Sequence, residues 1–161
     1  MSDEKNSIII APHPDDEIIG CFEILNKQNQ SITIIYGADT YGKRREETVK
    51  VREVFPSVKH QVFHNSVPTS YLANDATFYF PDPVNEIHPS HRGWGSIGEG
   101  LARSGYDVVF YTTIMNVPYI HEVNDPIKKE TLLSRCYTSQ KTLWDYEKKY
   151  VLFEGRCKWI F

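Results

Sequence analysis

The sequence contains few cysteines and no long apolar run. Its three cysteines, Cys21, Cys136 and Cys157, are scattered and form no Cys-x-x-Cys pair. This argues against a disulfide framework or a thiolate zinc site, and it fits a reducing compartment. No apolar stretch approaches the roughly 20 residues that span a bilayer, and the polar first residues lack the apolar part of a signal peptide. We therefore expect a cytoplasmic protein without membrane association.

The sequence also lacks internal repeats, low-complexity tracts and an excess of positive charge. The formal net charge of -3 over 161 residues argues against a protein that binds nucleic acid mainly through its phosphates. The hydrophobic content of 40% is ordinary for a globular protein and argues against disorder. The length suffices for one domain with a sizeable core, so a single domain over residues 1–161 is expected.

Strand-like and helix-like patterns alternate along the first part of the chain. Short apolar runs rich in β-branched residues are typical of buried strands, and apolar residues three or four positions apart are typical of helices. Such a β-α-β-α-β order implies right-handed crossovers and a parallel sheet with helices on both faces. The fold class expected is α/β, a Rossmann-like three-layer sandwich with a mainly parallel sheet. The elements are strands at 7–11, 31–36 and 59–63, a helix at 15–28, and a helix within 43–55.

The second half is less regular. A polar loop at 65–76 is expected to precede a short strand at 77–80, and Gly105 to cap a helix that ends before a buried strand at 107–113. Asp125 and Pro126 are typical of the first residues of a helix, which is predicted to reach at least Trp144. The aromatic tail is expected to pack back on the domain as a final strand. All three tryptophans are interpreted as core residues: Trp94, Trp144 and Trp159.

The most informative stretch joins the first strand to the first helix. His13 and the adjacent acids Asp15, Asp16 and Glu17 follow the apolar run 7–11 directly. In open α/β sheets, ligands bind at the carboxyl ends of the strands. Three crowded acidic groups repel one another unless a cation or the helix N-terminus compensates their charge. A metal ion is the economical explanation, and Glu17 is assigned to the helix dipole or to the surroundings of the ligands.

A second histidine pair has the same three-residue spacing. His88 and His91 lie at the start of a predicted helix, which also falls at the carboxyl edge of the sheet. Four ligands, with His13 and Asp16 added, would make a closed structural zinc site. Three ligands would leave a position open for water and a histidine and an aspartate free for proton transfer. Chemistry favours the second arrangement, but the residues alone do not say which histidine stays free.

These motifs resemble those of the PIG-L/LmbE-like zinc deacetylases, which remove acetyl groups from compounds containing N-acetylglucosamine. The stretch from Ala11 to Glu17 resembles the family signature, and the stretch from His88 to Arg92 resembles its second motif, usually His-Pro-Asp-His. Two weaker matches follow the family order along the chain: Arg44-x-x-Glu47 and Ser139-Gln140.

The resemblance implies a role for each motif residue. His13, Asp16 and His91 would bind zinc, and Asp15 would be the general base. His88 would stabilise the oxyanion or pass a proton.

Two further expectations accompany the resemblance. Arg44 is a candidate substrate contact. Ser90 stands where the family carries an acidic residue, so a carboxylate partner for a histidine is expected to be missing.

The expected function is hydrolysis of the acetamide of a soluble N-acetylglucosamine conjugate by metal-activated water. Little sequence separates the third strand from His88, so the pocket should be shallow and the rest of the substrate should extend out of it. One alternative is a metal-binding interaction module that has lost activity. Another is a metal-free Rossmann-like nucleotide-binding protein, which is disfavoured because no Gly-x-Gly-x-x-Gly follows the first strand.

Overall fold

The computed structural model describes residues 5–73 and 75–159. Its centre is a mixed seven-stranded sheet with the strand order β3-β2-β1-β4-β5-β7-β6. The first five strands of that order are parallel, whereas β7 pairs antiparallel with both β5 and β6. The strands are β1 (Lys5–Ala11), β2 (Gln30–Gly37), β3 (Val58–His64), β4 (Ala76–Pro81), β5 (Val108–Tyr111), β6 (Ile120–Glu122) and β7 (Phe153–Cys157).

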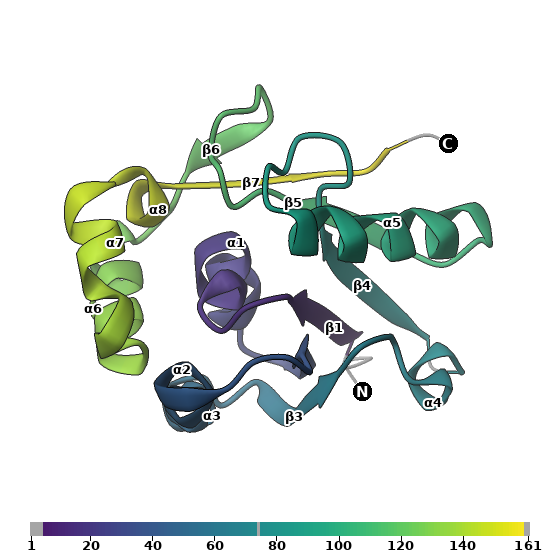
Figure 1. Cartoon of the computed structure of the whole chain (residues 1–161), viewed down its shortest axis with the longest axis horizontal. Coiled ribbons are helices and arrows are strands. Elements are labelled where there is room, and N and C mark those ends of the chain that lie inside the picture. The colour runs from purple at the N-terminus through teal and green to yellow at the C-terminus, as the bar shows by residue number, and fades with distance from the viewer. Residues whose placement is uncertain (1–4, 74, 160–161) are drawn as a thin grey trace.

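Helices connect the strands (Figure 1). They are α1 (Asp16–Leu25), α2 (Gly42–Glu47), α3 (Val49–Val54), α4 (Thr69–Leu72), α5 (Pro89–Arg103), α6 (Pro126–Cys136), the 3-10 turn η1 (Thr138–Gln140), α7 (Lys141–Tyr146) and α8 (Lys149–Leu152). In Figure 1, α6, α7 and α8 gather at one side of the molecule next to α1, and α5 lies apart from them. Among the described residues, no helix combines the length and the apolarity needed to cross a membrane.

The central strands are buried on both faces. On β1, Ile9 packs in one apolar cluster with residues of α1, α3 and α6, whereas Ile8 and Ile10 pack in a second cluster with Trp94 of α5. Successive side chains of a strand point to opposite faces, so two clusters along one strand require cover on both sides. The predicted alternation of strands and helices is therefore confirmed as an α/β fold with a mostly parallel sheet.

Several predicted helix boundaries are wrong. The first helix ends at Leu25 and not at 28. The helix predicted within 43–55 is divided at Thr48 into two pieces, and Thr48 Oγ1 donates to the Arg45 carbonyl there (2.7 Å). The long last helix stops at Cys136 instead of reaching Trp144. Tyr137 leaves the helical conformation there and turns its hydroxyl inward to donate to Glu17.

Other local predictions hold. The Asp125 side chain caps α6 by accepting from the Lys128 amide at 3.0 Å, with Pro126 in the first turn. Gly105 follows the C-cap of α5 with φ 92°, a conformation that glycine adopts without strain. The predicted tail strand is β7. Trp159 is 37% exposed, however, because it lies beyond the end of β7 at the rim of the fold, so its assignment to the core is wrong.

Helix α1 is kinked at Cys21, whose φ of -134° and ψ of 24° are not helical. An unbroken helix would join the Glu23 amide to the Ile19 carbonyl. Here the Glu23 amide donates to the Glu154 carboxylate (3.3 Å), and the Ile19 carbonyl accepts from Lys129 Nζ (2.7 Å). Lys129 and Glu154 are fully buried and lie 3.4 Å apart. A buried ion pair therefore satisfies both backbone groups that the kink releases.

Candidate metal centre

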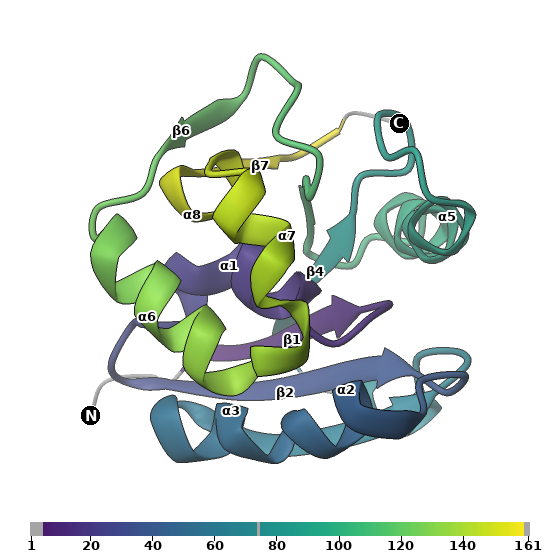
Figure 2. The ribbon, with the colours of Figure 1, turned by 60° about the vertical axis from the view of Figure 1, so that its left-hand side comes forward.

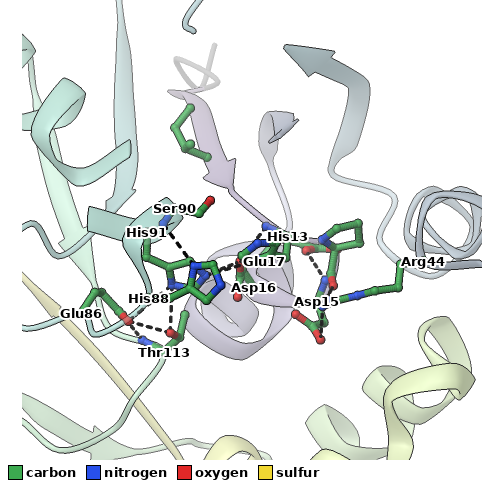
Figure 3. A network of polar contacts seen from close by, with 12 residues as sticks. His13, Asp15, Asp16, Glu17, Arg44, Glu86, His88, Ser90, His91 and Thr113 are labelled. Carbon is green, nitrogen blue, oxygen red and sulfur yellow. Dashed lines mark hydrogen bonds and ion pairs between the residues drawn. The ribbon is translucent and has the colours of Figure 1, made fainter. Parts of the chain in front are cut away.

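The two histidine segments meet where the strand order of the sheet reverses. His13 follows β1, and His88 and His91 begin α5 after β4, the neighbour of β1 on the side away from β2. Figure 3 shows these histidines side by side above the start of α1. Crevices at such reversal points are the usual ligand sites of parallel α/β sheets.

Three ligand atoms converge in this crevice. His91 Nε2 lies 3.1 Å from His13 Nδ1 and 3.1 Å from Asp16 Oδ2, and His13 Nδ1 lies 3.5 Å from Asp16 Oδ2. Ligands held at about 2.0–2.1 Å in a tetrahedron are separated by roughly 3.3–3.4 Å. The three separations therefore fit one face of a tetrahedral metal site. His13, His88 and His91 also form a histidine group close enough to hold an ion.

The loop that carries the first two ligands is held by its own hydrogen bonds. Asp16 Oδ2 accepts from the His13 amide at 2.8 Å, and the Asp16 amide donates back to the His13 carbonyl at 3.2 Å. Asp15 between them has φ 107° and ψ -29°, a conformation that is unfavourable for a residue with a side chain. Backbone strain of this kind is concentrated at functional sites.

The charges of the site are strongly coupled. Burial alone would raise the pKa of Asp16, but the His91 and His13 imidazoles outweigh it and hold that pKa well below its usual range. For His91, burial lowers the pKa, yet the Asp16 and Glu86 carboxylates raise it to about 10. A metal ion would take the place of that proton, because a histidine must be neutral to bind a metal.

Glu86 and Thr113 orient His91, the third candidate ligand, and neither was predicted from the sequence. His91 Nδ1 lies 3.4 Å from Glu86 Oε2 and 3.3 Å from Thr113 Oγ1. Glu86 is fixed in turn by the amide (2.5 Å) and hydroxyl (2.9 Å) of Thr113. A proton on Nδ1 would leave Nε2 free to face Asp16, the usual arrangement around metal-binding histidines. The expected lack of a carboxylate at Ser90 is thus offset for His91 by Glu86.

His88 is constrained differently. Its Nδ1 accepts a hydrogen bond from the Ser90 amide at 3.1 Å and caps α5. A neutral imidazole that accepts at Nδ1 carries its proton on Nε2, so Nε2 is a donor and not a ligand. Burial and the imidazoles of His13 and His91 lower the pKa of His88, which keeps it neutral. Although His88 lies close to the other two histidines, this tautomer makes it the histidine without a metal-binding lone pair.

Asp15 and Arg44 contact each other rather than the three ligands. Arg44 donates to Asp15 Oδ2 at 2.9 Å and to the Pro14 carbonyl at 2.7 Å. Asp15 is only 3% exposed. Burial and the Asp16 charge raise its pKa, and the Arg44 guanidinium opposes that rise.

Glu17 lies beneath the loop rather than at an exposed helix end. It is fully buried and accepts hydrogen bonds from the Tyr36 hydroxyl (3.1 Å), the Tyr137 hydroxyl and the Asp15 amide (3.0 Å). Burial raises its pKa to about 7. Glu17 therefore links the loop to β2 and to the end of α6.

The two weaker motifs contact each other. Glu47 accepts from the Ser139 amide (2.9 Å), the Ser139 hydroxyl (2.6 Å) and the Thr138 hydroxyl (3.0 Å). Burial raises the pKa of Glu47, but these hydrogen bonds outweigh it and lower the pKa. The contact holds α2, and with it Arg44, against the turn that follows α6.

Two hollows flank the centre. One of about 310 Å³ is lined by His13, Pro14, Asp39, Thr40, Tyr41 and Arg44. Another of about 410 Å³ is lined by Gly37, Asp39, Asn65, Ser90, Gly93, Trp94 and Ile97. Since Asp39 lines both, the two hollows adjoin each other beside the candidate ligands.

Comparisons with known proteins add no assignment to this geometry. No family model, no curated protein and no solved structure matches the chain.

Proposed function

We propose that this protein is a zinc-dependent amide hydrolase of the PIG-L/LmbE-like type that removes the acetyl group of an N-acetylglucosamine conjugate. The observation that carries the proposal is the triangle of His13, Asp16 and His91 ligand atoms at tetrahedral separations. These are the residues that the motif resemblance assigns to the metal. A single open position would remain for the reaction.

A Rossmann-like three-layer arrangement is part of the same proposal. The strand order 3-2-1-4-5 is that of doubly wound sheets, and the two apolar clusters lie on opposite faces of β1. The proposal also takes residues 1–161 as a single domain.

Zinc suits two imidazole nitrogens and one carboxylate oxygen better than calcium or magnesium, which prefer oxygen ligands. When bound, it supplies a Lewis acid that polarises an amide carbonyl and makes water nucleophilic near neutral pH. The chain's own contribution is to hold the three ligands at fixed separations. Glu86 and Thr113 maintain the orientation of His91.

Asp15 is the proposed proton acceptor. Its buried carboxylate, with a raised pKa, is a stronger base than an exposed aspartate, which favours removal of a proton from water. Arg44 holds this carboxylate in one orientation.

His88 is the proposed donor. Its Nε2–H is positioned by the Ser90 cap and would donate a hydrogen bond to the oxyanion, while the proton that Asp15 takes from water would pass on to the leaving nitrogen. General acid–base catalysis of this kind contributes on the order of 10²–10⁴ in rate.

The hollow beside Arg44 is the proposed substrate entrance. Arg44 Nε and Thr40 Oγ1 are buried there and have no hydrogen-bond partner among the described residues, although buried polar groups are normally paired. Hydroxyls or a phosphate on the group attached to the sugar would supply such partners after a small adjustment. This supports a soluble conjugate that extends out of the site rather than free N-acetylglucosamine.

A metal-binding module without turnover is the second candidate. It is favoured by one observation, the ion pair of Arg44 with Asp15, which occupies the proposed base.

Metal content and turnover separate the two candidates. Purified protein is analysed for bound metal, and release of free amine is measured on a panel of N-acetylglucosaminyl compounds with and without phosphate. We expect one zinc per chain and cleavage of at least one conjugate. Asp15→Asn should keep the zinc and lose nearly all turnover, because an amide cannot accept a proton at neutral pH. Bound zinc without cleavage of any amide would favour the second candidate, a metal-binding module without turnover. Loss of zinc in Asp15→Asn would show that Asp15 is a metal ligand and not the base.

A further inference from the structure

A hollow outside the candidate metal centre lies at the opposite end of the parallel strands. It has a volume of about 480 Å³ and is lined by the loop of residues 26–30, the loop of residues 55–57, the ends of α1 and α3, Lys59 of β3, and Lys128 of α6. These loops lead into β2 and β3, so the cleft lies at the amino ends of the strands, whereas the metal ligands follow the carboxyl ends. In Figure 2, the loop after α1 passes between α6 and α3 on its way into β2.

Three lysines with exposed side chains surround this cleft: Lys27, Lys59 and Lys128. Lys59 Nζ donates to the Pro56 carbonyl at 2.8 Å, and Lys128 Nζ donates to Asn26 Oδ1 at 2.5 Å. Both acceptors are neutral. Within residues 5–73 and 75–159, no ion pair involves any of the three lysines, and no acidic residue lines the cleft.

These lysines differ from several other surface lysines of the protein. The chain carries a net charge of -3, and Lys141, Lys148 and Lys158 all pair with carboxylates. Ammonium groups that pair with no carboxylate of the described residues create a positive potential around this hollow, which attracts anions.

The lysines could instead serve the ends of α1 and α3, where cations are favourable. The hydrogen bonds argue against that role. The Leu25 carbonyl at the end of α1 accepts from Ser57 Oγ (2.7 Å), and the Val51 carbonyl of α3 accepts from the Phe55 amide (2.9 Å). The hydrogen bonds of Lys59 and Lys128 do not reach a carbonyl in the last turn of α1 or α3. Their ammonium groups can therefore also contact a ligand.

Polar amides complete the lining. Asn26, Gln28, Asn29 and Gln30 contribute side chains that both donate and accept hydrogen bonds. Asn29 has φ 64°, which bends the loop that carries them. An anionic group could contact the lysines while hydroxyl groups contact the amides.

We propose that this cleft binds a small organic phosphate, with the phosphate at the lysines and a hydroxylated body at the amides. Lysine is a common phosphate ligand, and the volume falls in the range of small-molecule sites, about 300–1,000 Å³. The proposal is independent of the hydrolase function, since the cleft and the metal centre lie at opposite ends of the parallel strands.

Titration of the full chain with inorganic phosphate, glucose 6-phosphate and glucose tests the proposal. At constant ionic strength, we expect glucose 6-phosphate to bind more tightly than phosphate and glucose not to bind. Amide resonances of residues 26–30 and 55–59 should shift, and those around Arg44 should not. Absence of binding at millimolar glucose 6-phosphate, or shifts confined to residues around His13 and Arg44, would overturn the proposal.

Variants distinguish a ligand site from a structural role. The double variant Lys59→Gln/Lys128→Gln should weaken glucose 6-phosphate binding about tenfold or more, because each ammonium group near a dianion contributes a several-fold factor. Lys50→Gln is the control, since Lys50 is exposed on α3 but does not line the cleft. Equal affinity of both variants would overturn the proposal. If the unfolding midpoint of the double variant also fell, the lysines would have a structural role only.

Discussion

Replacing Lys129 by methionine should destabilise the protein far more than an ordinary helix substitution. The Nζ group donates to the carbonyls of Ile19 (2.7 Å) and Phe153 (3.0 Å) and pairs with Glu154. Breaking a buried ion pair costs about 3–5 kcal/mol. The low end applies here, because Arg156 still contacts the Glu154 carboxylate at 2.6 Å. We expect a loss of about 3 kcal/mol of unfolding free energy at neutral pH.

The effect of Lys129→Met should depend on pH with a defined sign. Burial lowers the pKa of Lys129 to about 8, although Glu154 opposes the shift, whereas an unfolded lysine has a pKa of about 10.4. Between these two values the unfolded chain binds more protons than the folded one, so raising the pH stabilises the folded state. The wild type should gain about 1–2 kcal/mol from this group between roughly pH 7 and 9.5. Methionine cannot gain it, so the difference between the two proteins should widen.

Urea unfolding of both proteins at the two pH values measures this difference. Lys128→Met, next in sequence and exposed, serves as the control and should change stability by less than about 0.5 kcal/mol. A Lys129→Met protein as stable as the control would refute the assignment of Lys129 to the kink of α1. A difference that narrows at high pH would refute the direction of the pKa shift.

Five further outcomes follow from the site and the core. His91→Ala should lose zinc as its primary defect while staying folded. Glu86→Gln should keep zinc with an affinity about 10–100-fold weaker. Competition with a chromophoric chelator measures the zinc affinity of both variants. Zinc affinity of the wild type should rise about tenfold per pH unit near neutrality, because His91, with a pKa of about 10 in the metal-free protein, must lose its proton. Tyr137→Phe should lower the unfolding free energy by about 1–3 kcal/mol, since a hydrogen bond to a buried carboxylate is removed. Gly20→Ala should lower it by about 1–3 kcal/mol or more, because a Cβ there would lie 2.2 Å from the Tyr111 ring; thermal unfolding checks both.

The parts of the fold that the sequence predicted are those determined by local periodicity. The apolar runs of β1 and β2 and the cap at Asp125 depend on neighbouring residues only. The break of α6 at Tyr137 could not be predicted this way, because it depends on Glu17, which is distant in sequence. The buried position of Lys129 has the same origin, since its partner Glu154 belongs to the last strand.

The same distinction between local and long-range signals applies to the residues of the candidate site. His13, Asp16, His88 and His91 were found because their spacing at strand ends is a local signal, and the structure brings them together. Glu86 was missed because nothing in the sequence shows that it faces His91. The one signal in the sequence was the position of Glu86, an acidic residue two positions before His88 at the carboxyl edge of the sheet. Acidic residues are too common on protein surfaces for this position to be decisive.

The two outermost strands bear on how this protein behaves at high concentration. At one end of the sheet, β3 exposes Lys59, His60 and His64, and at the other end β6 is only three residues long. A neighbouring molecule that added a strand would meet charged or titratable side chains at the first edge and too few backbone partners at the second. Charged and very short edge strands are devices by which natural sheets resist aggregation. In this way the two edges of the sheet disfavour fibrous growth.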